Sequence, residues 1–263
     1  MRMKKSIFVA FVLTVGLTAC KTTGNGRNDP DGSVATGMAI DEEHFPDAIF
    51  RAYLLEQNYG KDGVLTDKEI KGIYKIDLSN RGVKSVKGVE HFYNLGTLIV
   101  RGNPLGTLVL PHLERLNMLN CIGCELTELD FNECQGLTTV YCNANKLVKL
   151  TVNLPHLLNL EAPHNQLVEV KFGKEDKMRS LDLSENPLKG LDLSNCKGLE
   201  SVGIKGSKFS VAELNSFIKN LPQAVDYIEP VPADTKPAIV GLAAYRLSPE
   251  QKATVKEKGW NIQ

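Results

Sequence analysis

Neither sign of charge dominates this 263-residue chain, in which 31 Lys and Arg balance 31 Asp and Glu. Because no basic patch is present in the sequence, we expect no electrostatic binding to nucleic acid or to an anionic membrane surface. Catalytic patterns are scarce as well, because no Ser, Cys or carboxylate motif accompanies the histidines. The five histidines fall at unrelated positions: His44, His91, His112, His156 and His164. We therefore expect a protein that is not an enzyme.

The apolar stretch near the N-terminus is too short for a stable membrane-spanning helix. Residues 2, 4 and 5 are basic, residues 7–15 are apolar, and a Leu-Thr-Ala-Cys sequence ending at Cys20 resembles a bacterial lipobox. This pattern predicts a lipoprotein signal peptide over residues 1–19 and lipidation of Cys20. Lys21, in place of Asp, favours the outer membrane, with the periplasmic and surface leaflets both open. The alternative is an ordinary cleaved signal followed by an incidental cysteine.

Residues 20–40 are rich in Gly, Asn, Asp, Thr and Ser and show no apolar periodicity. Such a composition predicts a flexible tether. Because the signal peptide contains three basic residues, the mature chain keeps 28 basic and 31 acidic residues, a net charge of about −3. This mild charge again indicates no polybasic membrane patch.

The most prominent feature of the chain is a sequence pattern that recurs about every 21 residues. The pattern L-x-x-L-x-L-x-x-N-x-L begins at Leu95, Leu137 and Leu157, and at Met178 with Met in first place. A fixed period of this length with Leu and Asn is typical of leucine-rich repeats, in which each repeat is one coil of a solenoid. We predict such a solenoid over residues 74–206, with parallel strands on its concave face.

A second apolar triplet follows the Asn position of each repeat, and its alternation has the period of a β-strand. The triplets are Leu105-Leu108-Leu110, Leu126-Leu129-Phe131, Leu147-Leu150-Val152, Leu167-Val170-Phe172 and Leu188-Leu191-Leu193. We therefore expect a mainly β fold with short extended strands on the convex face, each paired with its neighbours. The repeat asparagines Asn103, Asn145, Asn165 and Asn186 are expected to satisfy backbone groups at the corner between the two strands.

Five cysteines follow Cys20, and an odd number cannot all pair with one another. They are Cys121, Cys124, Cys134, Cys142 and Cys196. An exported chain could oxidise them, and Cys121-x-x-Cys124 has the form of a zinc or redox motif. No second such motif or His pair lies at ligand spacing. Because repeat register explains both residues, we predict buried, reduced packing cysteines.

Different sequences close the two ends of the repeats. A helical N-terminal cap is predicted over residues 41–73, with an amphipathic helix at 47–57 and a second short helix that Thr66 caps. The first helix should place Phe45, Ile49, Phe50, Tyr53 and Leu54 on one face. An α/β C-terminal cap is predicted over 207–263, with helices at 211–220 and 249–258 and strands at 238–240 and 260–262.

The loop between the first two helices is the one metal candidate. Residues 58–69 fit the EF-hand frame, with Asn58 in position 1, Asp62 in position 5 and Glu69 in position 12. Gly60 in position 3 supplies no side-chain oxygen, so only two carboxylates face a cation and calcium should bind weakly. The alternative is a helix-loop-helix that is kept for its shape. No other cofactor is expected.

These features together resemble bacterial leucine-rich-repeat lipoproteins with short repeats, internalin-like in style. The resemblance rests on Leu126–Phe131 with Leu137–Asn145, on the block from Phe45 to Thr66, and on Lys258-Gly259-Trp260. It covers residues 41–263 and implies non-catalytic binding of a protein or other ligand at the cell envelope. Cys124, Ser207 and Arg81 depart from the repeat Asn, and we therefore expect the first and last coils to be distorted.

Residues between the inward leucines should point outward on the concave face. Ile99, Met118, Ile122 and Tyr141 then form an exposed apolar cluster near its middle, while later coils become acidic. We predict a partner-binding surface of nine residues: Ile99, Arg101, Met118, Asn120, Ile122, Tyr141, Asn143, Glu161 and Asp182. Apolar surface rimmed by charge is typical of a protein contact. The alternative is that strands simply favour Ile and Tyr, and that exposed apolar residues need no explanation.

The sequence thus predicts a monomeric, non-catalytic binding module at the cell envelope that recognises a protein or a glycan. Its only membrane contact would be the lipid anchor. The alternative is a structural or scaffolding envelope lipoprotein with no soluble ligand. Calcium stabilisation is compatible with both.

Overall fold

The computed structural model describes residues 27–28, 34–35, 37–224, 238–242 and 245–263. The predicted signal peptide, Cys20 and most of the predicted tether lie outside these residues. The chain divides into two compact units, residues 1–36 and 37–263. In the first unit, β1 (Arg27–Asn28) pairs antiparallel with β2 (Val34–Ala35). The second unit contains the repeats.

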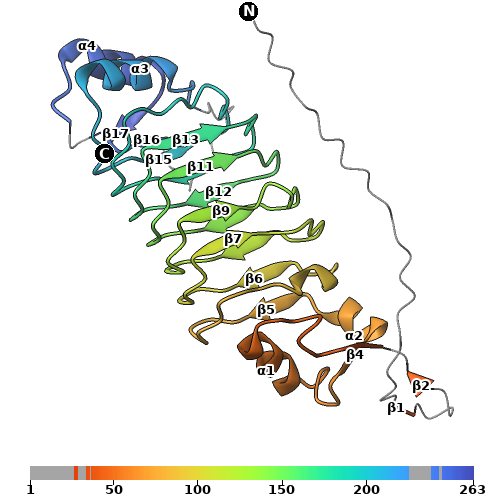
Figure 1. The fold of residues 1–263 in the computed structure, drawn as a ribbon. Coiled ribbons are helices and arrows are strands. Elements are labelled where there is room, and N and C mark those ends of the chain that lie inside the picture. Colours follow the sequence, from red (N-terminus) through yellow and green to blue (C-terminus); the bar gives the residue numbers. More distant parts are fainter. Residues whose placement is uncertain (1–26, 29–33, 36, 225–237, 243–244) are drawn as a thin grey trace, which may run out of the picture. The chain divides into compact units, whose positions relative to one another are not determined.

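One parallel strand from each coil forms the concave sheet of the second unit (Figure 1). These strands are β5 (Lys75–Asp77), β6 (Thr97–Ile99), β8 (Met118–Asn120), β10 (Thr139–Tyr141), β12 (Asn159–Glu161), β14 (Ser180–Asp182) and β15 (Ser201–Gly203). The middle residue of every strand is buried and its two neighbours are at least partly exposed, because successive side chains alternate between faces. The predicted leucine-rich-repeat solenoid is confirmed.

The convex face has a less regular set of strands than the sequence predicts. Its strands are β7 (Thr107–Val109), β9 (Glu128–Asp130), β11 (Lys149–Val152) and β13 (Glu169–Phe172). They pair only as β7 with β9 and β11 with β13, so continuous convex pairing is wrong. Between β9 and β11 a side chain bridges the coils: Asn132 Nδ2 donates to the Thr151 carbonyl at 3.2 Å, and its Oδ1 accepts from Asn153 N at 2.8 Å.

The fifth convex triplet, Leu188-Leu191-Leu193, is buried but forms no strand, contrary to prediction. Gly190 lies inside this triplet, and glycine weakens strands because it has no side chain to pack and a large backbone entropy to lose. The spacing of the apolar residues therefore predicts which side chains point inward. It does not predict whether the backbone forms strand hydrogen bonds.

The repeat asparagines connect each coil to the coil before it. Asn145 Nδ2 donates to the carbonyls of Cys142 and Cys121, both at 2.9 Å, and Cys121 belongs to the preceding coil. Its Oδ1 accepts from Cys124 N at 2.9 Å and Leu126 N at 3.0 Å. Equivalent inter-coil bonds are made by Asn103, Asn165 and Asn186. The predicted corner function of these buried amides is confirmed.

Cys124 replaces the asparagine in one coil and reproduces only part of its bonding. Its Sγ lies 3.0 Å from the Val100 carbonyl of the preceding coil. A thiol lacks the amide oxygen with which an asparagine accepts from backbone N–H groups of the preceding coil. Here Leu105 N donates to the Cys124 backbone carbonyl at 3.2 Å. The coil therefore keeps its register with a smaller side chain.

The N-terminal cap begins earlier than the sequence predicts. β3 (Gly37–Ala39) pairs antiparallel with β4 (Val64–Thr66), so the last residues of the predicted 20–40 tether belong to the cap. Met38 packs against the core and Ile40 is buried, and this apolar packing stabilises the segment. α1 (Ala48–Glu56) and α2 (Asp67–Gly72) follow, and Glu69 completes the predicted capping box. Ile49, predicted on the buried face, is 37% exposed.

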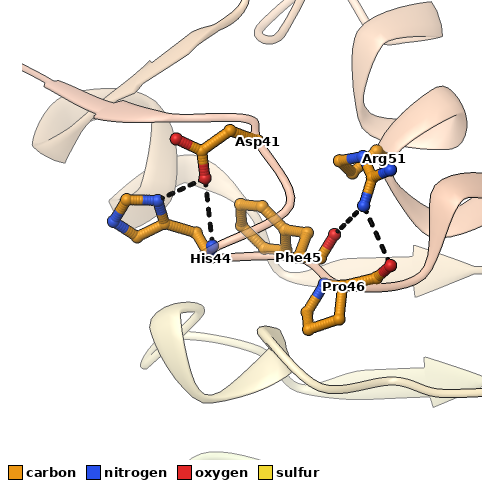
Figure 2. A network of polar contacts seen from close by, with 5 residues as sticks. All are labelled: Asp41, His44, Phe45, Pro46 and Arg51. Carbon is orange, nitrogen blue, oxygen red and sulfur yellow. Dashed lines mark hydrogen bonds and ion pairs between the residues drawn. The ribbon is translucent and has the colours of Figure 1, made fainter. Parts of the chain in front are cut away.

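Polar contacts fix the loop that enters α1 (Figure 2). The Asp41 carboxylate accepts from the His44 backbone N at 3.0 Å and lies 2.7 Å from its Nδ1. Arg51 Nη1 donates to the carbonyls of Phe45 and Pro46 at 2.6 and 2.9 Å. With both ends held, the Phe45 ring is fully buried and closes the first core layer.

The C-terminal cap contributes more to the concave sheet than expected. α3 (Val211–Asn220) and α4 (Pro249–Glu257) form close to their predicted positions. The predicted short strands β16 (Ile239–Val240) and β17 (Asn261–Ile262) continue the concave sheet in parallel beyond β15. A 3-10 helix, η1 (Val89–His91), lies in the first coil. Within the described residues, none of the helices has the length and apolarity needed to cross a membrane.

One core position holds a carboxyl group. Counting along the repeats, Leu113, Cys134, Leu154, Glu175 and Cys196 are equivalent, and all five are buried. Glu175 Oε1 accepts from Leu154 N at 3.0 Å, while its buried Oε2 has no hydrogen-bond partner. Burial raises the pKa of Glu175, the Leu154 amide opposes the increase and the Asp176 charge adds to it. The folded state therefore favours the neutral carboxyl group.

Replacing the corner amide should weaken the stack. We expect Asn145→Ala to lower the free energy of unfolding by about 3 kcal/mol, because buried backbone groups of two coils lose their partners. Urea denaturation measures this loss, with Asn195→Ala, at an exposed position, as the control. Equal stability of both variants would contradict a structural function for the amide.

Stability should also respond to Glu175. Because its pKa is raised on folding, its contribution is complete below the unfolded pKa of about 4.5 and is lost as pH rises through the folded pKa. We expect Glu175→Gln to remove this component and to be more stable than the parent at neutral pH. Denaturation curves from pH 4 to 8 test this, and Glu133→Gln, at an exposed position, should leave the parent's pH profile intact.

Candidate binding surface

The parallel register of the concave strands aligns their outward side chains in columns. The central column contains Asp77, Ile99, Asn120, Tyr141, Glu161, Asp182 and Gly203, each paired in register with the next. Adjacent parallel strands lie about 4.8 Å apart, so neighbouring side chains in a column touch or nearly touch. The structure thus brings the nine predicted residues onto one face, although their binding function stays a prediction.

The apolar cluster on this face is less exposed than predicted. Ile99, Met118, Ile122 and Tyr141 are all half-buried, and none is among the large exposed apolar side chains. Three of them have in-register neighbours on both sides: Ile99 lies between Asp77 and Asn120, Met118 between Thr97 and Thr139, and Tyr141 between Asn120 and Glu161. Arg101 is exposed beside them. The result is a shallow amphipathic surface rather than a projecting apolar patch.

In the coils from Glu161 onward, the outward side chains of the concave face are mostly polar. Glu161 Oε2 lies 3.4 Å from Asn143 Nδ2, and the Asp182 carboxylate accepts from Ser184 N at 2.9 Å. Glu185 pairs with Lys205 at 3.8 Å. His164 has a φ of 55° and occupies a corner between strands, as do four other non-glycine residues with positive φ. It is therefore a turn residue, like Ala144 one coil earlier.

A hollow of about 680 Å³ lies at the C-terminal end of this face. Its lining includes Glu161, Asp182, Lys205, Gly203 and Gly241. Sequence reasoning missed it because nothing in the repeat pattern shows that β16 continues the sheet. The available signal was Gly203, which interrupts a column of larger side chains.

The cysteines show no sign of a metal or redox site. All five described cysteines are free and buried, as predicted. Burial raises the pKa of Cys142 and Cys196 to about 12 and that of Cys134 to about 11, which suppresses the reactive thiolate. Among the described residues, no group of three or more His, Cys, Asp and Glu could hold a metal ion.

The EF-hand-like loop is shaped by packing. A Cβ at Gly60 would overlap the Leu54 carbonyl oxygen, so calcium position 3 can have no side chain in this conformation. Glu69 Oε2 accepts from Thr66 N at 2.9 Å and Thr66 Oγ1 at 2.7 Å, and Asp62 Oδ1 from Val64 N at 3.3 Å. The carboxylate in position 12 therefore already serves the helix cap, and calcium binding stays a prediction.

Comparison with known proteins supports the fold. Neither a family model nor a curated protein matches the chain. The functional domain of InlJ from Listeria monocytogenes, which includes a cysteine ladder, is similar at 24% identity and a TM-score of 0.52, over 74% of this chain and 48% of that one. The chain thus spans about half the length of the InlJ structure.

Two further bacterial structures are similar at lower TM-scores. Internalin C2 of Listeria monocytogenes is 17% identical with a TM-score of 0.49, over 77% of this chain and 96% of that one. A leucine-rich-repeat protein of Leptospira interrogans is 21% identical with a TM-score of 0.41, over 54% and 45%. Because both TM-scores are below 0.5, neither likeness carries an argument about this chain.

Calcium should have little effect on stability at low concentration. Since Asn58, Asp62 and Glu69 are the candidate side-chain ligands in the EF-hand frame and Glu69 caps α2, we expect binding no tighter than about 1 mM. Thermal melts in EDTA and in calcium test this, with magnesium as the control for ionic effects. A clear loss of stability in EDTA alone would show a tight site and contradict the expectation.

Proposed function

We propose that the protein is a non-catalytic binding module of the bacterial envelope that recognises a partner protein, or less favourably a glycan, through its concave face. The observation that carries the proposal is the in-register sheet, which arranges outward residues of nine strands into continuous columns. Such a surface is rigid, because every strand except those at the ends is hydrogen-bonded on both sides. Rigid presentation lowers the entropic cost of binding.

The middle of the concave face has the composition of a protein contact. Tyr141 lies in the column between Asn120 and Glu161, and Arg101 is exposed near its apolar neighbours. Tyr and Arg are enriched among residues that dominate binding energy, since both combine apolar area with directional hydrogen bonds. We infer that these two residues anchor the partner.

Anchoring to the envelope is the second part of the proposal. The lipobox-like sequence at Cys20 supports a lipid anchor, and Lys21 supports the outer membrane. Acyl chains on one cysteine would retain the protein at the membrane while residues 37–263 engage a partner. The leaflet decides whether that partner is periplasmic or outside the cell.

Loss of the two anchors should abolish recognition. We expect the full chain with Tyr141→Ala and Arg101→Glu to bind its partner at least about 100-fold more weakly, because each hot-spot truncation costs roughly 2 kcal/mol or more. The parent and the variant would be screened side by side against surface proteins and glycans, after their melting temperatures are matched.

The control variant carries an apolar-to-alanine change and a charge reversal on the convex strands, Val109→Ala with Lys171→Glu, both at exposed positions. It should bind like the parent. Equal binding by the concave variant and the parent would move the site to the convex face or the caps. Cys20→Ser should shift the chain out of the membrane fraction while binding persists, which separates anchoring from recognition.

A structural or scaffolding lipoprotein with no soluble ligand is the alternative function. It would predict no selective binding by the parent in the same screen. Changes on the concave face would then be silent, and only Cys20→Ser would alter membrane association.

A further inference from the structure

The hollow at the C-terminal end of the concave face arises from two glycines in one column. Val202 pairs with Val240, which puts Gly203 and Gly241 side by side at the following position. A Cβ at Gly203 would lie 2.5 Å from Asp182 Oδ1 and 3.0 Å from Ser184 Oγ. Because Gly203 and Gly241 have no side chains, the Asp182 carboxylate faces the hollow on that side.

Carboxylates of two neighbouring strands face this space. Glu161 and Asp182 are paired in register on β12 and β14, and both line the hollow. Like charges directly opposite each other destabilise a sheet unless a cation lies between or beside them. In the part of the chain that the structure describes, no ion pair includes either carboxylate.

Lys205 also lines the hollow, and its ion pair is with Glu185. Lys205 Nζ lies 3.8 Å from Glu185 Oε1, and the lysine side chain is 76% exposed. The remaining lining is rich in small hydroxyl side chains: Ser180, Ser184 and Ser201. The hollow thus combines two unpaired negative charges with several hydrogen-bond acceptors.

This combination suits a guanidinium group better than a metal ion. Two carboxylates are too few for a metal cage, and no cluster of three or more ligands exists among the described residues. A guanidinium is planar, always charged and carries five N–H donors that match carboxylate and hydroxyl oxygens. A volume of about 680 Å³ also accommodates the backbone on either side of such a side chain.

We propose that this hollow receives an arginine side chain from a segment of the partner protein, held by the carboxylates of Glu161 and Asp182 above the Gly203–Gly241 floor. The proposal rests on the proposed function, since it assigns the chemistry of the partner at one end of the same face. It adds charge recognition to the Tyr141 and Arg101 contact in the middle.

Labelled peptides test the hollow directly. The full chain would be titrated at low ionic strength with Gly-Ser-Arg-Ser-Gly and with the same peptide carrying lysine or neutral citrulline in place of arginine. We expect arginine to bind at least about fivefold more tightly than citrulline, with lysine between them. Asp182→Asn and Gly241→Leu should each reduce arginine binding to the citrulline level.

The two variants act by different means. Asp182→Asn removes charge, whereas Gly241→Leu fills the hollow from a position where a Cβ meets neighbours no closer than 3.4 Å. Asp192→Asn is the matched control, because Asp192 is exposed outside the hollow and accepts from Ser194 N at 2.9 Å, as Asp182 does from Ser184 N. It should change binding by less than about twofold.

Equal loss in the Asp182 and Asp192 variants would overturn the proposal, because it would show general charge attraction. Unchanged binding by a folded Gly241→Leu variant would overturn it as well. If Asp182→Asn fails to fold, the Gly241 variant and the citrulline peptide still decide. A partner from the surface screen that binds the parent and both hollow variants equally would sustain the proposed function while refuting this site.

Discussion

The inter-coil hydrogen bonds of the corner asparagines are the constraint on which the rest of the molecule depends. Each amide joins two coils and fixes the distance and register between them, as Asn145 does by bonding to Cys142 of its own coil and to Cys121 and Leu126 of the preceding one. Because a coil buries its leucines only against adjacent coils, stacking and core formation are one event. Fixed register also aligns the outward residues in columns, so the proposed binding surface is a consequence of the same bonds.

Buried aromatic side chains cover the core at both ends of the stack. At the N-terminus, Phe45 is buried beside Phe50 with ring centroids 5.5 Å apart. At the C-terminus, the Trp260 ring is buried and its Nε1 donates to the Pro222 carbonyl at 2.7 Å. The C-terminal cap does more than cover leucines, because its strand β16 extends the concave sheet and supplies Gly241 to the hollow.

The concave face therefore has two chemically distinct regions on one rigid support. Half-buried apolar side chains and Arg101 occupy the middle, and unpaired carboxylates border the hollow near the C-terminal cap. Such a division allows a partner to be oriented by charge while its binding energy comes from apolar contact. The buried cysteines and the helix-loop-helix belong to the framework in the described structure, since their polar groups serve packing and capping.

The sequence by itself determined the solenoid, the inward residues, the corner asparagines and the order of the concave columns, because a repeat of about 21 residues gives each repeat position one environment. It could not determine whether the convex triplets would pair, since burial of Leu188 or Leu191 requires no ladder. It also could not foresee that residues 37–39 pair with β4, or that Gly203 and Gly241 meet. Each of these contacts includes a segment outside the repeats, where no periodicity specifies the partner and only tertiary packing decides it.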